Sequence, residues 1–306
     1  MKLNVGMSGH FKMVAVDELG NERFLAEFEN LILDSGLNAM PIQQYGRDCR
    51  VGSGSSTPIS SQTTLDNKIA STNTIQSDNY GAQATAPYYG WRRKTYRFGQ
   101  GIAAGNLSEV GVGWDNTGNI STATALFSRS LIKDNNGNPI TITVLANEFL
   151  DVTYELRLYP SLNDIVSTIN VNGISTICTT RSAVVTNVLW GALLINQGFA
   201  QPYGAFSSSC YPSSSSLGAI TAQPTGSQGG TTSFATWGVY SNGTYSLVLT
   251  IPSSLNDANV PGGIGCIATY TYLGAYQTSF NPPLPKDNTK SLTITMTFSW
   301  SRRNAP

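Results

Sequence analysis

The chain has little charge and no charge imbalance. Its 306 residues include 18 Lys and Arg against 18 Asp and Glu, and charged residues make up 12% of the total. Soluble domains usually contain about 25%. A chain without net positive charge lacks the electrostatic field that draws nucleic acid or anionic lipid to a protein surface. We therefore expect no nucleic-acid partner.

Histidine and cysteine are also scarce, which limits the chemistry available. The four cysteines, Cys49, Cys178, Cys210 and Cys266, form no CxxC pair, so no zinc site is recognisable. We expect four reduced, mostly buried thiols. The single histidine, His10, has no Gly-x-Ser-x-Gly nucleophile turn to act with. Carboxylates on one strand, such as Asp151 and Glu155, are more often solvated than a glycosidase pair. We expect no enzymatic activity, no metal and no cofactor.

No apolar run is long enough to cross a bilayer. The best candidate, residues 184–195, is interrupted by Thr186 and Asn187, whereas a transmembrane helix needs about 20 predominantly apolar residues. The first six residues have no apolar core of signal-peptide length. These features predict a soluble protein made in a cytoplasm, without membrane insertion.

The chain is rich in residues that favour turns and strands. It contains 30 Gly and 14 Pro, and together with abundant Ser, Thr and Asn these favour turns and strands. Apolar residues alternate with polar ones over residues 150–158 and 292–300. A period of two residues predicts strands with one buried face, as in antiparallel sheets.

Shorter signals complete the predicted architecture. The Asn172-Gly173 pair predicts a two-residue hairpin turn, and Asp34 or Ser35 is placed to begin one helical turn that runs to Met40. We expect residues 55–90 to form a long loop or extended arm, with a helical turn around residues 65–69. The prediction is an all-β fold of two antiparallel β-sandwich-like domains with long Ser/Thr/Gly-rich loops, divided into residues 1–160 and 161–306.

Charge is distributed very unevenly between these two parts. Residues 1–160 hold 28 of the 36 charged side chains and residues 161–306 hold 8. Between residues 165 and 285 only Arg181 and Asp257 are charged. Three interpretations remain open for the neutral surface. It faces an uncharged, hydroxyl-rich ligand such as a sugar, or it is buried between subunits, because interface cores are depleted of Lys, Glu and Asp. The third is a polar β domain of the secreted type with no special surface.

Aromatic residues in or beside the polar loops are the candidate ligand-binding residues. They are Tyr203, Phe206, Tyr211, Trp237, Tyr240 and Tyr276. Aromatic faces pack on the C–H surfaces of sugars while Asn, Gln and Ser supply hydrogen bonds. The same side chains are equally suited to a protein core or a subunit interface, where Tyr and Trp dominate the binding energy.

One basic run stands in the first part, with Arg92, Arg93, Lys94 and Arg97 among aromatic residues. Basic residues interleaved with aromatics suit stacking on nucleic-acid bases. A single cluster of four charges in a neutral chain better fits a strand held by salt bridges, or a docking patch.

Four stretches of the first part resemble, as an ordered set, structural tail proteins of tailed bacteriophages and prophages, of the tail-fibre or tail-tip kind. They are residues 28–38 (FENLILDSGLN), 49–54 (CRVGSG), 105–114 (GNLSEVGVGW), and 126–129 (LFSR) leading to 149–154 (FLDVTY). The resemblance covers roughly residues 10–160, and it brings no catalytic residues with it.

The resemblance implies a component of the virion tail that is made in the host cytoplasm and forms a homo-oligomer, with a trimer favoured. Its partners would be other virion tail proteins and a bacterial surface glycan or protein. We expect an adhesin whose charged part docks on the virion while its neutral part meets the host. The alternatives are a purely structural virion component (tail-tip, baseplate, collar or head decoration) with its neutral surface buried, or a depolymerase.

Overall fold

The computed structural model describes residues 2–41, 45–114, 125–188, 190, 208–225 and 235–303. Strands account for 57% of the chain and helix for 3%, which confirms the predicted all-β fold. The elements of the first part are β1 (Lys2–Val16), β2 (Glu22–Ile32), α1 (Asp34–Ala39), β3 (Asp48–Gly52), β4 (Lys68–Thr72), β5 (Ile75–Ala82), β6 (Gly90–Phe98), β7 (Gly105–Leu107), β8 (Glu109–Trp114), β9 (Ala125–Leu131), β10 (Ile142–Val144) and β11 (Phe149–Tyr159).

The second part adds eight further strands to the described chain. They are β12 (Ile165–Val171), β13 (Ile174–Ser182), β14 (Ser208–Ser213), β15 (Thr236–Trp237), β16 (Ser246–Ser253), β17 (Ile264–Thr271), β18 (Gly274–Leu284) and β19 (Leu292–Arg302).

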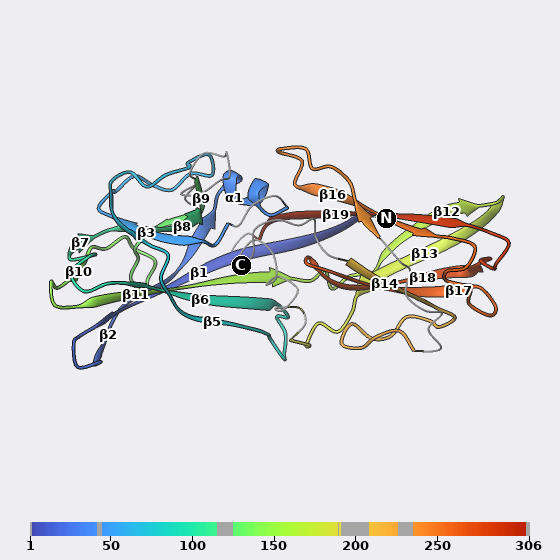
Figure 1. The fold of residues 1–306 in the computed structure, drawn as a ribbon, viewed down its shortest axis with the longest axis horizontal. Helices are drawn as coiled ribbons and strands as arrows, with labels where there is room; N and C mark the ends of the chain where they lie inside the picture. The colour runs from blue at the N-terminus through green and yellow to red at the C-terminus, as the bar shows by residue number, and fades with distance from the viewer. Residues whose placement is uncertain are drawn as a thin grey trace.

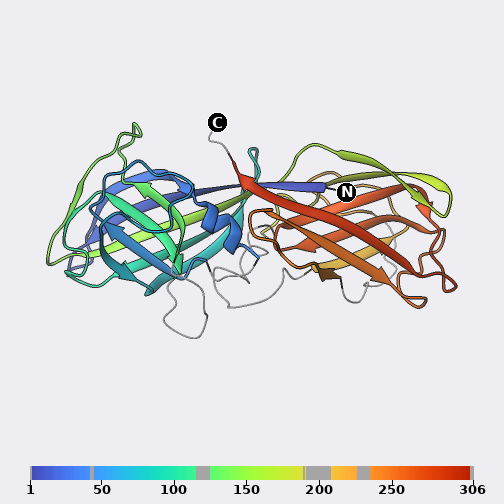
Figure 2. The ribbon, with the colours of Figure 1, turned by 90° about the horizontal axis from the view of Figure 1, so that it is seen from above.

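Two large sheets contain most of these strands. A twelve-stranded sheet has the order β15-β16-β19-β1-β2-β9-β8-β3-β4, with β11, β6 and β5 branching from β1. A five-stranded sheet has the order β12-β13-β18-β17-β14. Figures 1 and 2 show two lobes, one built from the blue and green strands and the other mainly from the yellow to red strands.

Strand β1 belongs to both lobes. Its first residues, Lys2 to Met7, pair in parallel with Thr297 to Arg302 of β19, while the rest of the strand pairs with β11 and β2. The sheet therefore crosses the predicted boundary at residue 160, as the long blue strand in Figure 2 illustrates. The division into two sandwich-like domains stays a prediction.

One continuous apolar cluster runs through both lobes. In the first lobe the Tyr154 ring of β11 lies 4.9 Å from the Phe11 ring of β1 and 6.4 Å from the Phe127 ring of β9. In the second lobe the Tyr276 ring of β18 lies 5.4 Å from the Phe298 ring of β19. The five-stranded sheet thus packs against the β16–β19 layer. All four cysteines are buried thiols outside any disulfide, as predicted.

The period-two patterns have the predicted burial. On β11 the apolar residues Leu150, Val152, Tyr154, Leu156 and Leu158 are at most 1% exposed. On β19 the residues Met296, Phe298 and Trp300 are equally buried. The helical turn from Asp34 is α1, and the predicted hairpin joins β12 to β13.

The prediction for residues 55–90 is wrong in its second half. Two strands, β4 and β5, lie there, and β4 begins where a helical turn was expected. Strand β5 pairs with β6 at an edge of the sheet. Seven of its eight residues are exposed or half-buried, with only Gly81 buried. A strand with no buried apolar face carries no alternating hydrophobic signal, because both faces meet water.

Candidate functional site

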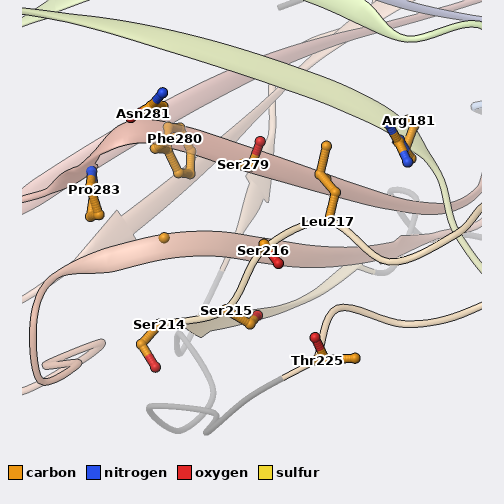
Figure 3. A pocket seen from close by; sticks show the side chains of 11 residues that line it. Arg181, Ser214, Ser215, Ser216, Leu217, Thr225, Ser279, Phe280, Asn281 and Pro283 are labelled. Carbon is orange, nitrogen blue, oxygen red and sulfur yellow. The ribbon is translucent and has the colours of Figure 1, made fainter.

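A groove of about 780 Å³ lies on the five-stranded sheet of the neutral part. In Figure 3, loop residues 214–217 lie along one side of it and β18 along the other, with Arg181 at one end. Six of its eleven lining residues carry hydroxyl or amide side chains, namely Ser214, Ser215, Ser216, Thr225, Ser279 and Asn281. Leu217 and Pro283 add apolar surface.

The alternation of β18 positions the sheet side of the groove. Tyr276 and Phe280 are buried toward the β16–β19 layer, so Ser279 and Asn281 face the opposite side, since successive residues of a strand alternate. Their side chains are half-buried and exposed, respectively. The outer face of the sheet therefore presents polar groups at the groove.

A glycine on β17 lets the opposing loop come close to the sheet. A Cβ atom added at Gly265 would lie 2.7 Å from the Ser215 carbonyl oxygen and 3.0 Å from that of Ser214. Any larger residue would push the loop outward. The loop is held further by the Ser213 hydroxyl, which lies 2.6 Å from the Ser215 hydroxyl and donates to the Cys266 carbonyl at 3.2 Å.

Gln277, a completely buried side chain of β18, fixes the loop beyond the groove. Its Oε1 accepts the Gly218 amide at 2.7 Å, and its Nε2 donates to the Ala219 and Gly218 carbonyls at 3.0 and 3.2 Å. A buried amide with its donors and acceptor satisfied makes the loop position specific. One wall of the groove is thus a loop tied to the strand below it.

Among the described lining residues, the one charged group is neutralised. Arg181 donates through Nε and Nη2 to the two oxygens of Asp164 at 2.8 and 2.5 Å, and through Nη1 to the Gly218 carbonyl at 3.1 Å. The bidentate pair leaves the groove without net charge. A neutral ligand rich in hydroxyl groups matches this lining better than an ion does.

The groove has no evident catalytic machinery among its described lining residues. Its serines have no histidine or carboxylate beside them in the lining, and a serine nucleophile needs such a base. Burial raises the pKa of the neighbouring Cys266 thiol to about 12, so it stays protonated. Within the described ranges, no cluster of three or more His, Cys, Asp or Glu is placed to bind a metal.

Two of the six predicted aromatic residues, Tyr203 and Phe206, lie outside the described residues. Tyr211 is half-buried on β14, and its ring meets the Tyr270 ring edge-on at 5.7 Å. None of the four described aromatics lines the groove. Their role in binding a ligand stays a prediction.

The other three aromatics gather around β19. Trp237 lies 5.2 Å from Phe298, and Tyr240 stacks on Trp300 at 5.7 Å. Tyr276 is 1% exposed and lies inside the second lobe, so it belongs to the core in this structure. These ring contacts are those of core residues, which is one of the two roles that the sequence left open.

No sequence pattern marks the groove, because its polar residues come from separate segments of the chain. The run from Ser213 to Ser216 reads as a low-complexity loop, and Ser279 and Asn281 stand more than sixty residues later. Only the pairing of β18 with β17 and of β17 with β14 brings them together.

The basic run forms a strand held by salt bridges, one of its two predicted roles. On β6, Arg92 pairs with Asp78 of β5, and Arg93 pairs with Glu155 of β11. Arg97 pairs with Asp151 at 2.7 Å. The acidic partners lie on β5 and β11, the two strands that flank β6. The salt bridges therefore connect three strands.

Comparison of the chain with protein-family models, with curated proteins and with solved structures gives no match in any of the three. Among the described residues, no helix has the length and apolar character that a membrane span requires.

Proposed function

We propose that the protein is a bacteriophage virion tail protein that acts as an adhesin, binding a glycan or protein of the bacterial surface without catalysing a reaction on it. The proposal rests on the sequence resemblance in the first part and on the unequal charge of the two parts. In this view residues 1–160 dock on other tail proteins, and the neutral part meets the host. The protein acts as a homo-oligomer, with a trimer favoured.

The observation that carries the proposal is the neutral, hydroxyl-lined groove. Its volume of about 780 Å³ falls within the roughly 300–1,000 Å³ common for ligand sites. Its hydroxyl and amide groups suit hydrogen bonds to sugar hydroxyls, while Leu217 and Pro283 offer small apolar patches. Since Arg181 is neutralised by Asp164, an acidic or basic ligand gains no charge partner there.

The test is binding of the fluorescently labelled full chain to intact bacteria and to their purified surface polysaccharides. The groove variant is Ser216→Trp, which places an indole in the groove opening. The matched control is Ser175→Trp, because Ser175 is equally exposed but lies on β13 outside the groove lining. We expect binding to fall by about tenfold or more in the groove variant, since steric exclusion removes most of the contact.

Two results would count against the proposal. Labelled protein that binds none of a broad panel of strains would remove the adhesin role. Binding that is equally strong in Ser216→Trp and in the wild type would place the receptor contact elsewhere. Circular dichroism of each variant establishes that the fold is retained.

A purely structural virion role is the second candidate, favoured by exposed apolar side chains on the β12–β13 hairpin. Val166 is 63% exposed, and Ile174 and Ile177 are each 47% exposed. Such residues are suited to burial against a neighbouring subunit. Hydroxyl-radical labelling of Leu217 in the groove and of Ile174 on the hairpin in intact particles separates the candidates, because a surface buried in the assembly is protected from the label and cannot bind a receptor.

A further inference from the structure

A second cavity, of about 350 Å³, lies on the charged face of the first lobe. Four adjacent strands contribute to it, in the order β2, β1, β11 and β6. Its charged and titratable lining consists of His10, Lys12, Glu27, Arg93, Glu155 and Arg157.

The strand register gathers these side chains on one face. His10 of β1 lies opposite Glu155 of β11, and Glu155 lies opposite Arg93 of β6. Lys12 stands two residues beyond His10, and Arg157 two beyond Glu155, so both project from the same face of the sheet. The register of the paired strands therefore brings these side chains together.

Glu155 holds two arginines in fixed positions. Its side chain is 4% exposed, and its two oxygens accept hydrogen bonds from the Nε atoms of Arg93 and Arg157. Each guanidinium also lies over an aromatic ring, with Arg93 4.4 Å from the Trp91 centroid and Arg157 4.9 Å from that of Tyr89. The ion pairs and the rings together orient both guanidinium groups.

Hydrogen-bond donors remain for a ligand. Both bonds to Glu155 use Nε, so the terminal amino groups of Arg93 are not consumed by it. Arg157 also bonds to Tyr159. Lys12 is exposed and, within the described part of the chain, forms no ion pair within 4.0 Å, although Glu27 is its cross-strand neighbour. Amino groups from three strands, β1, β6 and β11, thus border one cavity.

The charged residues that line the cavity give it a net positive charge, which an anion can balance. Lys12, Arg93 and Arg157 give three positive charges against two carboxylates, Glu27 and Glu155, which is a net charge of +1 when His10 is neutral. Glu29, the exposed cross-strand neighbour of His10, does not line the cavity. Glu27 lies 3.6 Å from the Nε2 atom of His10, so it faces the histidine.

We propose that this cavity binds a tetrahedral oxyanion, the phosphate or sulfate group of a ligand. Donors that approach from three strands match a group with three terminal oxygens better than a planar carboxylate. Arginine and lysine are the usual partners of such groups, the first through paired hydrogen bonds and the second as a point charge. This site is separate from the neutral groove and does not depend on it.

The experiment is isothermal titration calorimetry of the full chain with sulfate, inorganic phosphate, dimethyl phosphate or acetate, at constant ionic strength set with chloride. The key variant is Lys12→Gln, because the Lys12 side chain forms no ion pair with any residue that the structure describes. Lys68→Gln, at an exposed lysine of β4, is the control for general loss of charge. We expect saturable sulfate and phosphate binding that weakens by about fivefold or more in Lys12→Gln only.

A second variant and the comparison of anions distinguish the possible results. A second variant, Arg93→Gln, should weaken sulfate binding as well, with its fold checked by circular dichroism. Binding of dimethyl phosphate as well as of the free ions would identify a phosphodiester as the natural group, whereas binding of the free ions alone would identify a terminal phosphate or sulfate. The proposal is overturned if no anion binds above chloride, if Lys12→Gln binds sulfate normally, or if acetate binds as tightly as sulfate.

Discussion

Arg129 and Glu109 form an ion pair in which both side chains are completely buried, with the arginine Nη2 atom 2.8 Å from the glutamate Oε2 atom. Glu109 also accepts the backbone amides of Gly54 and Asn67 at 3.0 and 2.8 Å. Arg129 reaches Gln62 at 2.6 Å as well. The pair therefore ties the loop between β3 and β4 to β8 and β9.

Replacing Arg129 with methionine should destabilise the fold severely. The change leaves Glu109 buried without its cation, and breaking a buried pair in this way costs about 3–5 kcal/mol. Urea unfolding followed by tryptophan fluorescence measures the change in free energy of unfolding. Lys68→Met, at an exposed lysine, is the control and should change it by less than about 0.5 kcal/mol. Equal effects of the two substitutions would contradict the structural role of the pair.

Replacing Gln277 with leucine should release the groove loop. Leucine is similar in size but leaves the Gly218 amide and the Ala219 carbonyl without their partner. Unpaired buried groups of this kind cost roughly 1–3 kcal/mol. We expect faster hydrogen exchange at Gly218 and weaker binding at the groove, measured by mass spectrometry and the cell-binding assay.

The control for this prediction is Gln76→Leu, at an exposed glutamine of β5. Hydrogen exchange at Gly218 should be unchanged in that variant. If exchange is equally slow in Gln277→Leu, then the loop is held by other contacts and the amide of Gln277 is dispensable.

The sequence predicts those strands whose two faces differ in environment. The alternation on β11 and β19 marks them because one face is buried and the other meets water. Strand β5 has no such difference and was missed. The parallel pairing of Lys2 with Thr297 was also beyond prediction, because a strand's local pattern does not identify a partner almost three hundred residues away.

The candidate site was less predictable than the fold. Serine and asparagine hydroxyls and amides are common in loops, so Ser214 and Asn281 carry no signal until tertiary packing brings them together. Aromatic residues such as Trp237 and Tyr240 fit a core as well as a ligand site by sequence, and the structure packs both on β19. The distribution of charge is visible in the sequence because it needs no knowledge of pairing.

The four cysteine thiols should be unreactive until the protein unfolds. All four are buried and outside any disulfide, and burial raises the pKa of the Cys49, Cys178 and Cys266 thiols. Since the thiolate is the reactive form, a thiol reagent at neutral pH should label none in the native protein and all four in urea. Rapid labelling of one thiol in the native state would indicate local opening around it.

Lys94 should give the protein a distinctive dependence of stability on pH. Its side chain is buried and donates to the Gly46 carbonyl at 2.9 Å. Burial, with the nearby Arg92 charge, lowers the pKa of the Lys94 ammonium from 10.5 to about 8, although Asp78 opposes the shift. Above the folded-state value the native protein has released this proton while the unfolded chain still holds it. The free energy of unfolding therefore rises with pH in this range.

Comparison with Lys94→Met isolates this effect, because buried tyrosines such as Tyr96, whose pKa is raised, act in the opposite direction in both proteins. The stability of the wild type relative to the variant should increase by up to about 3 kcal/mol between about pH 8 and about pH 10.5, and be independent of pH near neutrality. Urea unfolding of both proteins across this range measures the difference. A difference that stays constant would mean that Lys94 titrates normally in the native state, and hence that water reaches its ammonium group.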